Sequence, residues 1–156
     1  MKRFDAAFLV LSWVVMGFSF AFFVPMAWDW FGEGGDHVRV WGWCFLFTLA
    51  TGGWLWVRTR HAHRELTVRD GFLLVTLVWV VMPAYASLPL LFTVQGISFT
   101  DAYFEAVSGL TATGATALAG LDLLAPSVNI WRCFLQLIGG LGIMLLAVAI
   151  LPFLGL

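Results

Sequence analysis

Four long apolar runs, separated by shorter polar segments, dominate the pattern of this chain. They cover residues 6–28, 40–57, 71–92 and 133–156, and none of them contains Asp, Glu, Lys or Arg. An α-helix rises about 1.5 Å per residue, so about 20 residues cross the roughly 30 Å hydrocarbon core of a bilayer. Because a helix satisfies its own backbone hydrogen bonds, it is the form that such a run takes in lipid. The pattern therefore predicts an all-α integral membrane protein with four transmembrane helices.

Composition indicates the same class. Of the 156 residues, 62% are hydrophobic and 11% are charged. A soluble domain of this length cannot enclose so much apolar surface in one core, whereas membrane lipid accepts it on the outside. With a formal net charge of -1 and no basic excess, a nucleic-acid partner is not expected.

Basic residues are concentrated at one side of the predicted bundle. They precede the first run and fill the segment between the second and third runs: Lys2, Arg3, Arg58, Arg60, Arg64 and Arg69. Cytoplasmic loops carry an excess of Lys and Arg, so we expect the N-terminus and loop 58–70 to be cytoplasmic. Loop 31–39 and segment 93–130 are then expected on the opposite side.

Segment 93–130 is too apolar for an ordinary loop. Ser98 and Asp101 have the spacing of a helix cap, and residues 99, 103, 106 and 110 follow at helical spacing. These features predict a short helix over residues 99–110. Its length of about 18 Å reaches only about halfway through the hydrocarbon, so we interpret it as a re-entrant helix.

The chain changes character after this short helix. The next residues are Thr111, Ala112, Thr113, Gly114, Ala115 and Thr116. β-Branched residues and a glycine disfavour a helix, and non-helical backbone at membrane depth is tolerated only where it is buried in protein or lines a water-filled cavity. Successive carbonyls can replace the hydration shell of a cation, and Gly114 can adopt backbone angles forbidden to other residues. The pattern favours a cation filter, with a simple connector between two spans as the alternative.

Two stretches carry a resemblance to a known family. They read SFTDAYFEAVSGLTATGAT and IWRCFLQLIGGLGIMLLAVAILPFLGL. With the residues around them, from about 69 to 156, they resemble the first pore repeat of the Trk/Ktr/HKT superfamily of potassium transporters, in particular its TrkH-like membrane subunits. Residues 1–68 resemble the additional N-terminal helix pair and basic cytoplasmic loop of those subunits by layout. Members of the family place four helix, pore-loop, helix repeats around one permeation path.

The resemblance implies a role for each part of residues 69–156. It implies an outer helix over 71–92, a pore helix over 99–110, a filter strand over 111–116 and an inner helix over 131–156. The main-chain carbonyls of Thr113 and Gly114 are then expected to bind potassium, the transported ion. Thr111, Ala112, Ala115 and Thr116 complete the filter strand. Related sequences often have threonine where this chain has Ala112, but ligation by a carbonyl does not depend on that side chain.

The resemblance also implies a function and partners. It implies potassium uptake, passive or by symport, across the bacterial inner membrane. It implies a homodimer of the full-length subunit and a cytoplasmic, TrkA-like nucleotide-binding regulatory subunit. Three of the four repeats are absent between Met1 and Leu156, so we expect the remaining repeats or other copies of the chain to close the pore. The alternative is a truncated, non-conducting membrane fragment or a structural and assembly piece.

Enzymatic activity and an organic cofactor are not expected. The chain contains no HExxH or GxSxG motif, and its three histidines, His37, His61 and His63, fall in predicted loops.

Individual residues carry further expectations. Glu105, in the short helix, either accepts hydrogen bonds from neighbouring loop backbone or attracts cations. Arg132 is expected to extend toward the lipid headgroups, with Asp122 as an alternative partner. Pro83 and Pro89 predict kinks or an early end of the third span.

Overall fold

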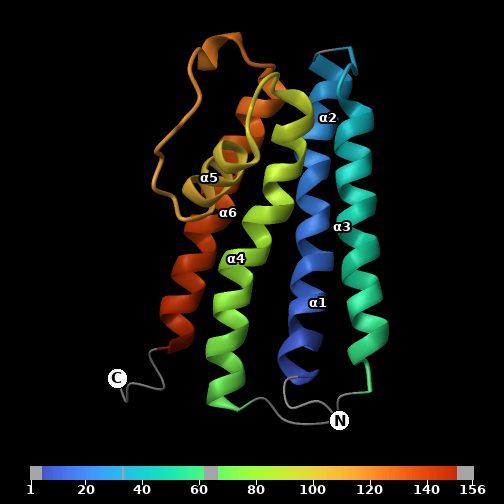
Figure 1. Cartoon of the computed structure of the whole chain (residues 1–156), viewed down its shortest axis with the longest axis vertical. Helices are drawn as coiled ribbons and strands as arrows, with labels where there is room; N and C mark the ends of the chain where they lie inside the picture. Colours follow the sequence, from blue (N-terminus) through green and yellow to red (C-terminus); the bar gives the residue numbers. More distant parts are fainter. Residues whose placement is uncertain (1–4, 33, 62–66, 151–156) are drawn as a thin grey trace.

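The computed structural model of the chain describes residues 5–32, 34–61 and 67–150, and its regular structure is helical throughout these ranges (Figure 1). Four helical spans in this part are long and apolar enough to cross a membrane: Asp5–Gly32, Val38–Thr59, Arg69–Thr93 and Pro126–Met144. The prediction of an all-α membrane protein with four spans is confirmed. The elements are α1 (Asp5–Ser19), η1 (Phe20–Phe22), α2 (Phe23–Gly32), α3 (Val38–Thr59), α4 (Val68–Thr93), α5 (Phe99–Leu110), η2 (Leu121–Leu123) and α6 (Pro126–Ile150).

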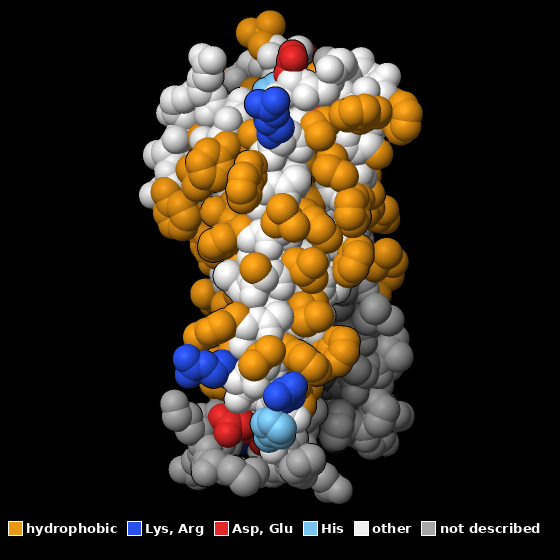
Figure 2. Space-filling view, turned by 90° about the vertical axis from the view of Figure 1, so that its right-hand side faces the viewer, with side chains coloured by type: hydrophobic (Ala, Val, Ile, Leu, Met, Phe, Trp, Pro, Cys, Tyr) orange, Lys and Arg blue, Asp and Glu red, His pale blue; other side chains and the backbone are white. Residues whose placement is uncertain are grey.

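The exterior of the bundle is apolar over most of its length. Figure 2 shows one face on which hydrophobic side chains cover the middle and charged or histidine side chains lie near the two ends. Large exposed side chains of this kind include Trp13, Trp43, Phe47 and Trp54. This distribution suits a surface surrounded by lipid.

The first span is not the single uninterrupted helix that the sequence predicts. A short 3₁₀ turn, η1, separates α1 from α2. Pro25 has no amide hydrogen to donate, and its ring crowds the carbonyl one turn earlier, at Ala21. The α-helical hydrogen-bond pattern is therefore interrupted just before Pro25, while the span as a whole continues to Gly32.

The third span is longer than predicted at its start. A capping box explains this: the Thr67 hydroxyl accepts a hydrogen bond from the Asp70 amide (3.3 Å), and the Thr67 amide donates to the Asp70 carboxylate (3.0 Å). α4 therefore begins at Val68 and not at residue 71. An early end at Pro83 or Pro89 is also wrong, because both prolines lie fully buried inside α4, which continues to Thr93.

The last span starts earlier than the expected residue 131. α6 begins at Pro126, a residue suited to the first turn because its missing amide hydrogen would have no helical partner there. Polar residues of the first turns bond within the protein, as when the Asn129 amide group donates to the Leu121 carbonyl (2.9 Å). The apolar-run criterion missed these turns because Asn129 and Arg132 interrupt the run. The predicted end, residues 151–156, lies outside the described residues.

Trp131 ties most of the bundle together. Its fully buried indole stacks on Phe22 (ring centroids 4.8 Å apart) and meets Trp41 edge-on (5.8 Å). Its ring nitrogen donates to the Ala86 carbonyl (3.0 Å). One side chain of α6 thereby contacts η1, α3 and α4.

The short helix α5 packs beside the upper halves of α4 and α6 (Figure 1). Ala102, Ala106 and Leu110, spaced one turn apart, form its buried face. The Tyr103 hydroxyl donates to the Val80 carbonyl of α4 (3.0 Å). At its C-terminal end α5 lies directly on α6, where a Cβ atom placed on Gly139 would collide with the Leu110 carbonyl.

This close approach gives a stability prediction. We expect Gly139→Ala to destabilise the chain by about 1–3 kcal/mol, because the added methyl group forces α5 away from α6. Gly140→Ala is the matched control, since a Cβ atom there meets nothing within 4 Å. Thermal unfolding of both variants in detergent would measure the difference. Equal melting temperatures for the two variants would contradict this packing.

Candidate functional site

The segment that follows α5 has no regular secondary structure. We call residues 111–116 the TATGAT segment. Residues 112–117 are all exposed. Figure 1 shows the chain descending from the upper end of α4 through α5 and then returning, through this segment and η2, to the upper end of α6.

The amide groups at the start of the TATGAT segment turn back toward α5. Thr111 donates to the Val107 carbonyl (2.9 Å), Ala112 to the Gly109 carbonyl (2.9 Å), and Thr113 to the Ser108 carbonyl (2.9 Å). The chain therefore folds over the C-terminal end of α5. Three amide donors are satisfied by carbonyls that the helix itself leaves without partners.

Two residues of the segment adopt left-handed backbone angles. Gly114 has φ +74°, as its residue type allows. Ala112 has φ +54° and is the only non-glycine residue of the described chain with positive φ. Residue type alone does not predict this angle for Ala112. Its small side chain between two β-branched threonines was the available signal, because a β-branched residue is a more serious outlier in this region.

The carbonyl groups of the segment differ in their surroundings. Within the described ranges, no group donates a hydrogen bond to the carbonyl oxygens of Ala112, Thr113 or Gly114. The Ala115 carbonyl, in contrast, accepts a hydrogen bond from the Ser108 hydroxyl (2.6 Å). Three consecutive carbonyl oxygens are therefore available to an external ligand, and the fourth is held by α5.

The threonine hydroxyls stabilise the start of the segment. The Thr111 hydroxyl donates to the Val107 carbonyl (2.8 Å) and lies 2.8 Å from the Thr113 hydroxyl, with which it shares a second hydrogen bond. Both side chains thereby fix the backbone rather than extend freely into solvent.

Glu105 holds the end of the segment from behind. Its carboxylate is buried, with the residue 4% exposed. One oxygen, Oε1, accepts hydrogen bonds from the Thr116 hydroxyl (2.6 Å), the Ala117 amide (2.6 Å) and the Leu118 amide (3.3 Å). Of the two interpretations of Glu105 from the sequence, the structure has the one in which it bonds to the loop backbone.

The second oxygen of Glu105 pairs with Arg132. Oε2 lies 3.0 Å from Nε of Arg132, whose side chain is 16% exposed. The expectation that Arg132 extends toward the headgroups or pairs with Asp122 is therefore wrong. A buried carboxylate needs a compensating charge, and Arg132 on α6 provides it.

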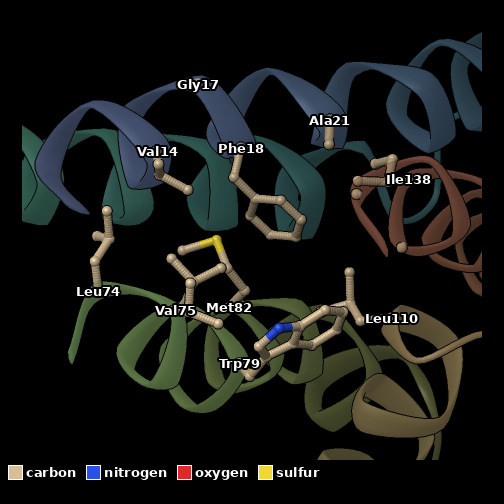
Figure 3. Close-up of a pocket in the computed structure, with 13 residues that line it drawn as sticks. Val14, Gly17, Phe18, Ala21, Leu74, Val75, Trp79, Met82, Leu110 and Ile138 are labelled. Carbon is tan, nitrogen blue, oxygen red and sulfur yellow. The ribbon is translucent and has the colours of Figure 1, made fainter. Parts of the chain in front are cut away.

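An apolar pocket of about 470 Å³ lies below the C-terminal end of α5, between α1, α4 and α6 (Figure 3). Val14 and Phe18 of α1 point into it opposite Trp79 and Met82 of α4. Its lining is almost entirely apolar. It therefore offers no ligands comparable to the carbonyls of the TATGAT segment.

Comparison with known proteins agrees with the resemblance noted in the sequence. Residues 42–156 match the TrkH family of cation transport proteins. The chain is 50% identical over 109 residues to the Trk system potassium uptake protein TrkH of Halomonas elongata, and 48% identical over 112 residues to that of Escherichia coli K12. These alignments cover 69% and 71% of this chain and 23% of each relative, so the chain spans about a quarter of their length.

The fold is also similar to a solved structure, that of the potassium transporter TrkH from Vibrio parahaemolyticus. The TM-score is 0.90 at 38% sequence identity, covering 99% of this chain and 33% of the other. This similarity includes the N-terminal helices that lie before residue 42. The chain therefore belongs to the TrkH family of cation transport proteins.

Proposed function

We propose that this chain supplies one quarter of the selectivity filter of a potassium uptake protein. The observation that carries the proposal is a row of three consecutive exposed residues, Ala112 to Gly114, whose carbonyl oxygens have no donor in the described chain. Carbonyl oxygens of this kind replace the water around a cation in filters. The family membership and the potassium uptake activity named for the relatives support the same ion.

In this proposal the TATGAT segment lies at membrane depth. α5 is a re-entrant pore helix, and α4 and α6 are the outer and inner helices around it. α5 has only 12 residues, against 26 in α4, and it lies beside the upper halves of both neighbours. From the upper end of α4, the chain descends through α5 partway along the bundle and then returns to the upper end of α6 (Figure 1). The carbonyl end of a helix carries partial negative charge, which favours a cation near the TATGAT segment.

Thr113 and Gly114 are the proposed main ligands of potassium, and Thr111, Ala112, Ala115 and Thr116 complete the strand. The engaged Ala115 carbonyl indicates a supporting role for that residue. One segment can surround an ion from one side only. The proposed site is therefore completed by further pore repeats or other copies of the chain, and transport involves no covalent chemistry.

The proposal includes location and partners. The chain is placed in the bacterial inner membrane, with the N-terminus and loop 58–70 in the cytoplasm, and with loop 31–39 and segment 93–130 on the periplasmic side. At the proposed cytoplasmic end, the Arg58 guanidinium lies 4.8 Å from the centre of the Trp54 ring, an arrangement suited to the headgroup region. A homodimer and a TrkA-like nucleotide-binding regulatory subunit remain partners that the family resemblance implies.

The filter assignment can be tested at Gly114. A complete transporter is obtained as a chimera in which this chain replaces the matching segment of the Escherichia coli relative, expressed in a strain without its own potassium uptake. A Cβ atom at Gly114 meets nothing within 4 Å in the described chain, so within this chain Gly114→Ala adds the cost of the left-handed angle without a steric clash. That cost of about 1–2 kcal/mol lowers the population of the filter conformation by roughly 5- to 30-fold, and we expect selectivity for potassium over sodium to fall by up to that factor.

Gly71→Ala is the control for this experiment, because Gly71 also has open space around its Cβ position but lies in the first turn of α4. It should transport as the parent chimera does. Unchanged uptake and selectivity for Gly114→Ala would rule out the filter assignment.

Reconstitution of the 156-residue chain alone in vesicles tests whether it conducts by itself. We expect no potassium flux from a single copy. Potassium flux would indicate that copies of the chain assemble into a pore, and its absence is the result expected for a non-conducting piece.

Orientation can be tested by cysteine labelling. Asp36 and His61 are both exposed and lie at opposite ends of α3. In a chain with Cys44→Ala and Cys133→Ser, a membrane-impermeant maleimide should label Asp36→Cys in intact cells. It should label His61→Cys only after the inner membrane is opened. The reverse pattern would contradict the proposed orientation.

A further inference from the structure

We propose that the Glu105–Arg132 pair is a positioning device that sets the ion selectivity of the TATGAT segment. The inference rests on the proposed filter function of that segment and adds two residues that do not touch the ion. The contacts of Glu105 and Arg132 join the loop at residues 116–118 to α5 and α6 at one buried point.

The carboxylate of Glu105 is engaged on both sides. Its Oε1 atom accepts three hydrogen bonds, all from residues 116–118, and its Oε2 atom accepts one from Arg132. Hydrogen bonds to an ionised acceptor are about twice as strong as neutral ones. A residue 4% exposed with four donors around its carboxylate is therefore a firm attachment point for the loop.

The attachment lies directly after the proposed ligands. The segment is fixed at its start by the three amides that bond to the end of α5, and at its end by Ser108 and Glu105. Between these attachments, the carbonyls of Ala112, Thr113 and Gly114 are without donors in the described chain. Both attachments limit how far these carbonyls can turn, and ligands held in a fixed geometry discriminate better between similar ions.

Arg132 extends the same network to the return path of the chain. Its Nη1 atom donates to the Asn129 side-chain oxygen (3.5 Å), and the Asn129 amide group donates to the Leu121 carbonyl (2.9 Å). The loop is therefore held at residues 116–118 and again at Leu121 by side chains of neighbouring helices. α6 thereby determines where the outer end of the TATGAT segment sits.

The nature of the donors makes the proposal specific. Thr116, Ala117 and Leu118 all present hydrogen-bond donors, so the position of Glu105 requires an acceptor. An ion pair alone would be restored by exchanging the two charges. The double variant Glu105→Arg with Arg132→Glu restores the pair but places donors against donors, and we expect it not to restore selectivity.

The test uses the chimera described above, with competition between potassium, rubidium and sodium as the readout. Glu105→Gln and Arg132→Gln should each lower selectivity for potassium over sodium by about tenfold, the order expected for loss of a charge-assisted hydrogen bond. Arg132→Lys, which keeps the charge, should retain most of the selectivity. Asp101→Asn is the matched control, because Asp101 lies one turn earlier on α5 and, within the described ranges, its carboxylate bonds only to Ser98.

A variant that is only less stable gives fewer transporters in the membrane, but each of them keeps its preference for potassium. Selectivity measured per transporter therefore distinguishes a loss of positioning from a loss of stability. If Glu105→Gln does not accumulate in the membrane, Thr116→Val removes a single donor from the same carboxylate and should give the same direction of change. Selectivity equal to that of Asp101→Asn in these variants, or full rescue by the charge exchange, would overturn the inference. If Gly114→Ala is also without effect, the filter assignment itself fails; if Gly114→Ala alone changes selectivity, only the role of the pair fails.

Discussion

The structure depends on the hydrogen bonds that hold the non-helical TATGAT segment against α5 at both of its ends while three of its carbonyl groups accept none from the described chain. In lipid an unpaired amide is costly, and irregular backbone at membrane depth must be supported by protein. The TATGAT segment, for which we propose membrane depth, directs its first amides to the end of α5, where the helix has carbonyls without partners. Glu105 accepts from the amides that follow the segment. The amides of residues 111–113, 117 and 118 thereby bond inside the protein, whereas the carbonyl oxygens of residues 112–114 accept no hydrogen bond from the described chain.

The rest of the chain holds α5 where this exchange can occur. α5 lies on α6 at Gly139, where any larger residue would meet the Leu110 carbonyl. Trp131 fixes α6 against η1, α3 and α4 through ring contacts and one hydrogen bond. One turn of α6 therefore carries both the central packing residue and, at Arg132, the partner of Glu105. Packing and loop geometry are linked through the same helix.

Much of this fold could be predicted from local sequence patterns. The four apolar runs gave the spans, and Ser98 gave the start of α5, where its hydroxyl accepts a hydrogen bond from the Asp101 amide (3.1 Å). Local signals failed where tertiary contacts decide. Asn129 and Arg132 interrupt the apolar pattern just before residue 133, so the pattern places the start of the helix after them. Both nevertheless lie in α6, where Asn129 bonds to Leu121 of the preceding loop and Arg132 bonds to Glu105 of α5. The Glu105–Arg132 pair joins residues 27 positions apart, which no helical or strand period connects.

The central claim is that the carbonyl oxygens of the TATGAT segment bind the transported ion. The measurement that tests it most directly is a structure of the chimeric transporter prepared in thallium, a heavy cation close in size to potassium. The expected result is strong cation density at coordination distance from the carbonyl oxygens of Thr113 and Gly114. Density elsewhere, for example against the Glu105 carboxylate, with none beside these two carbonyls, would contradict the proposed filter.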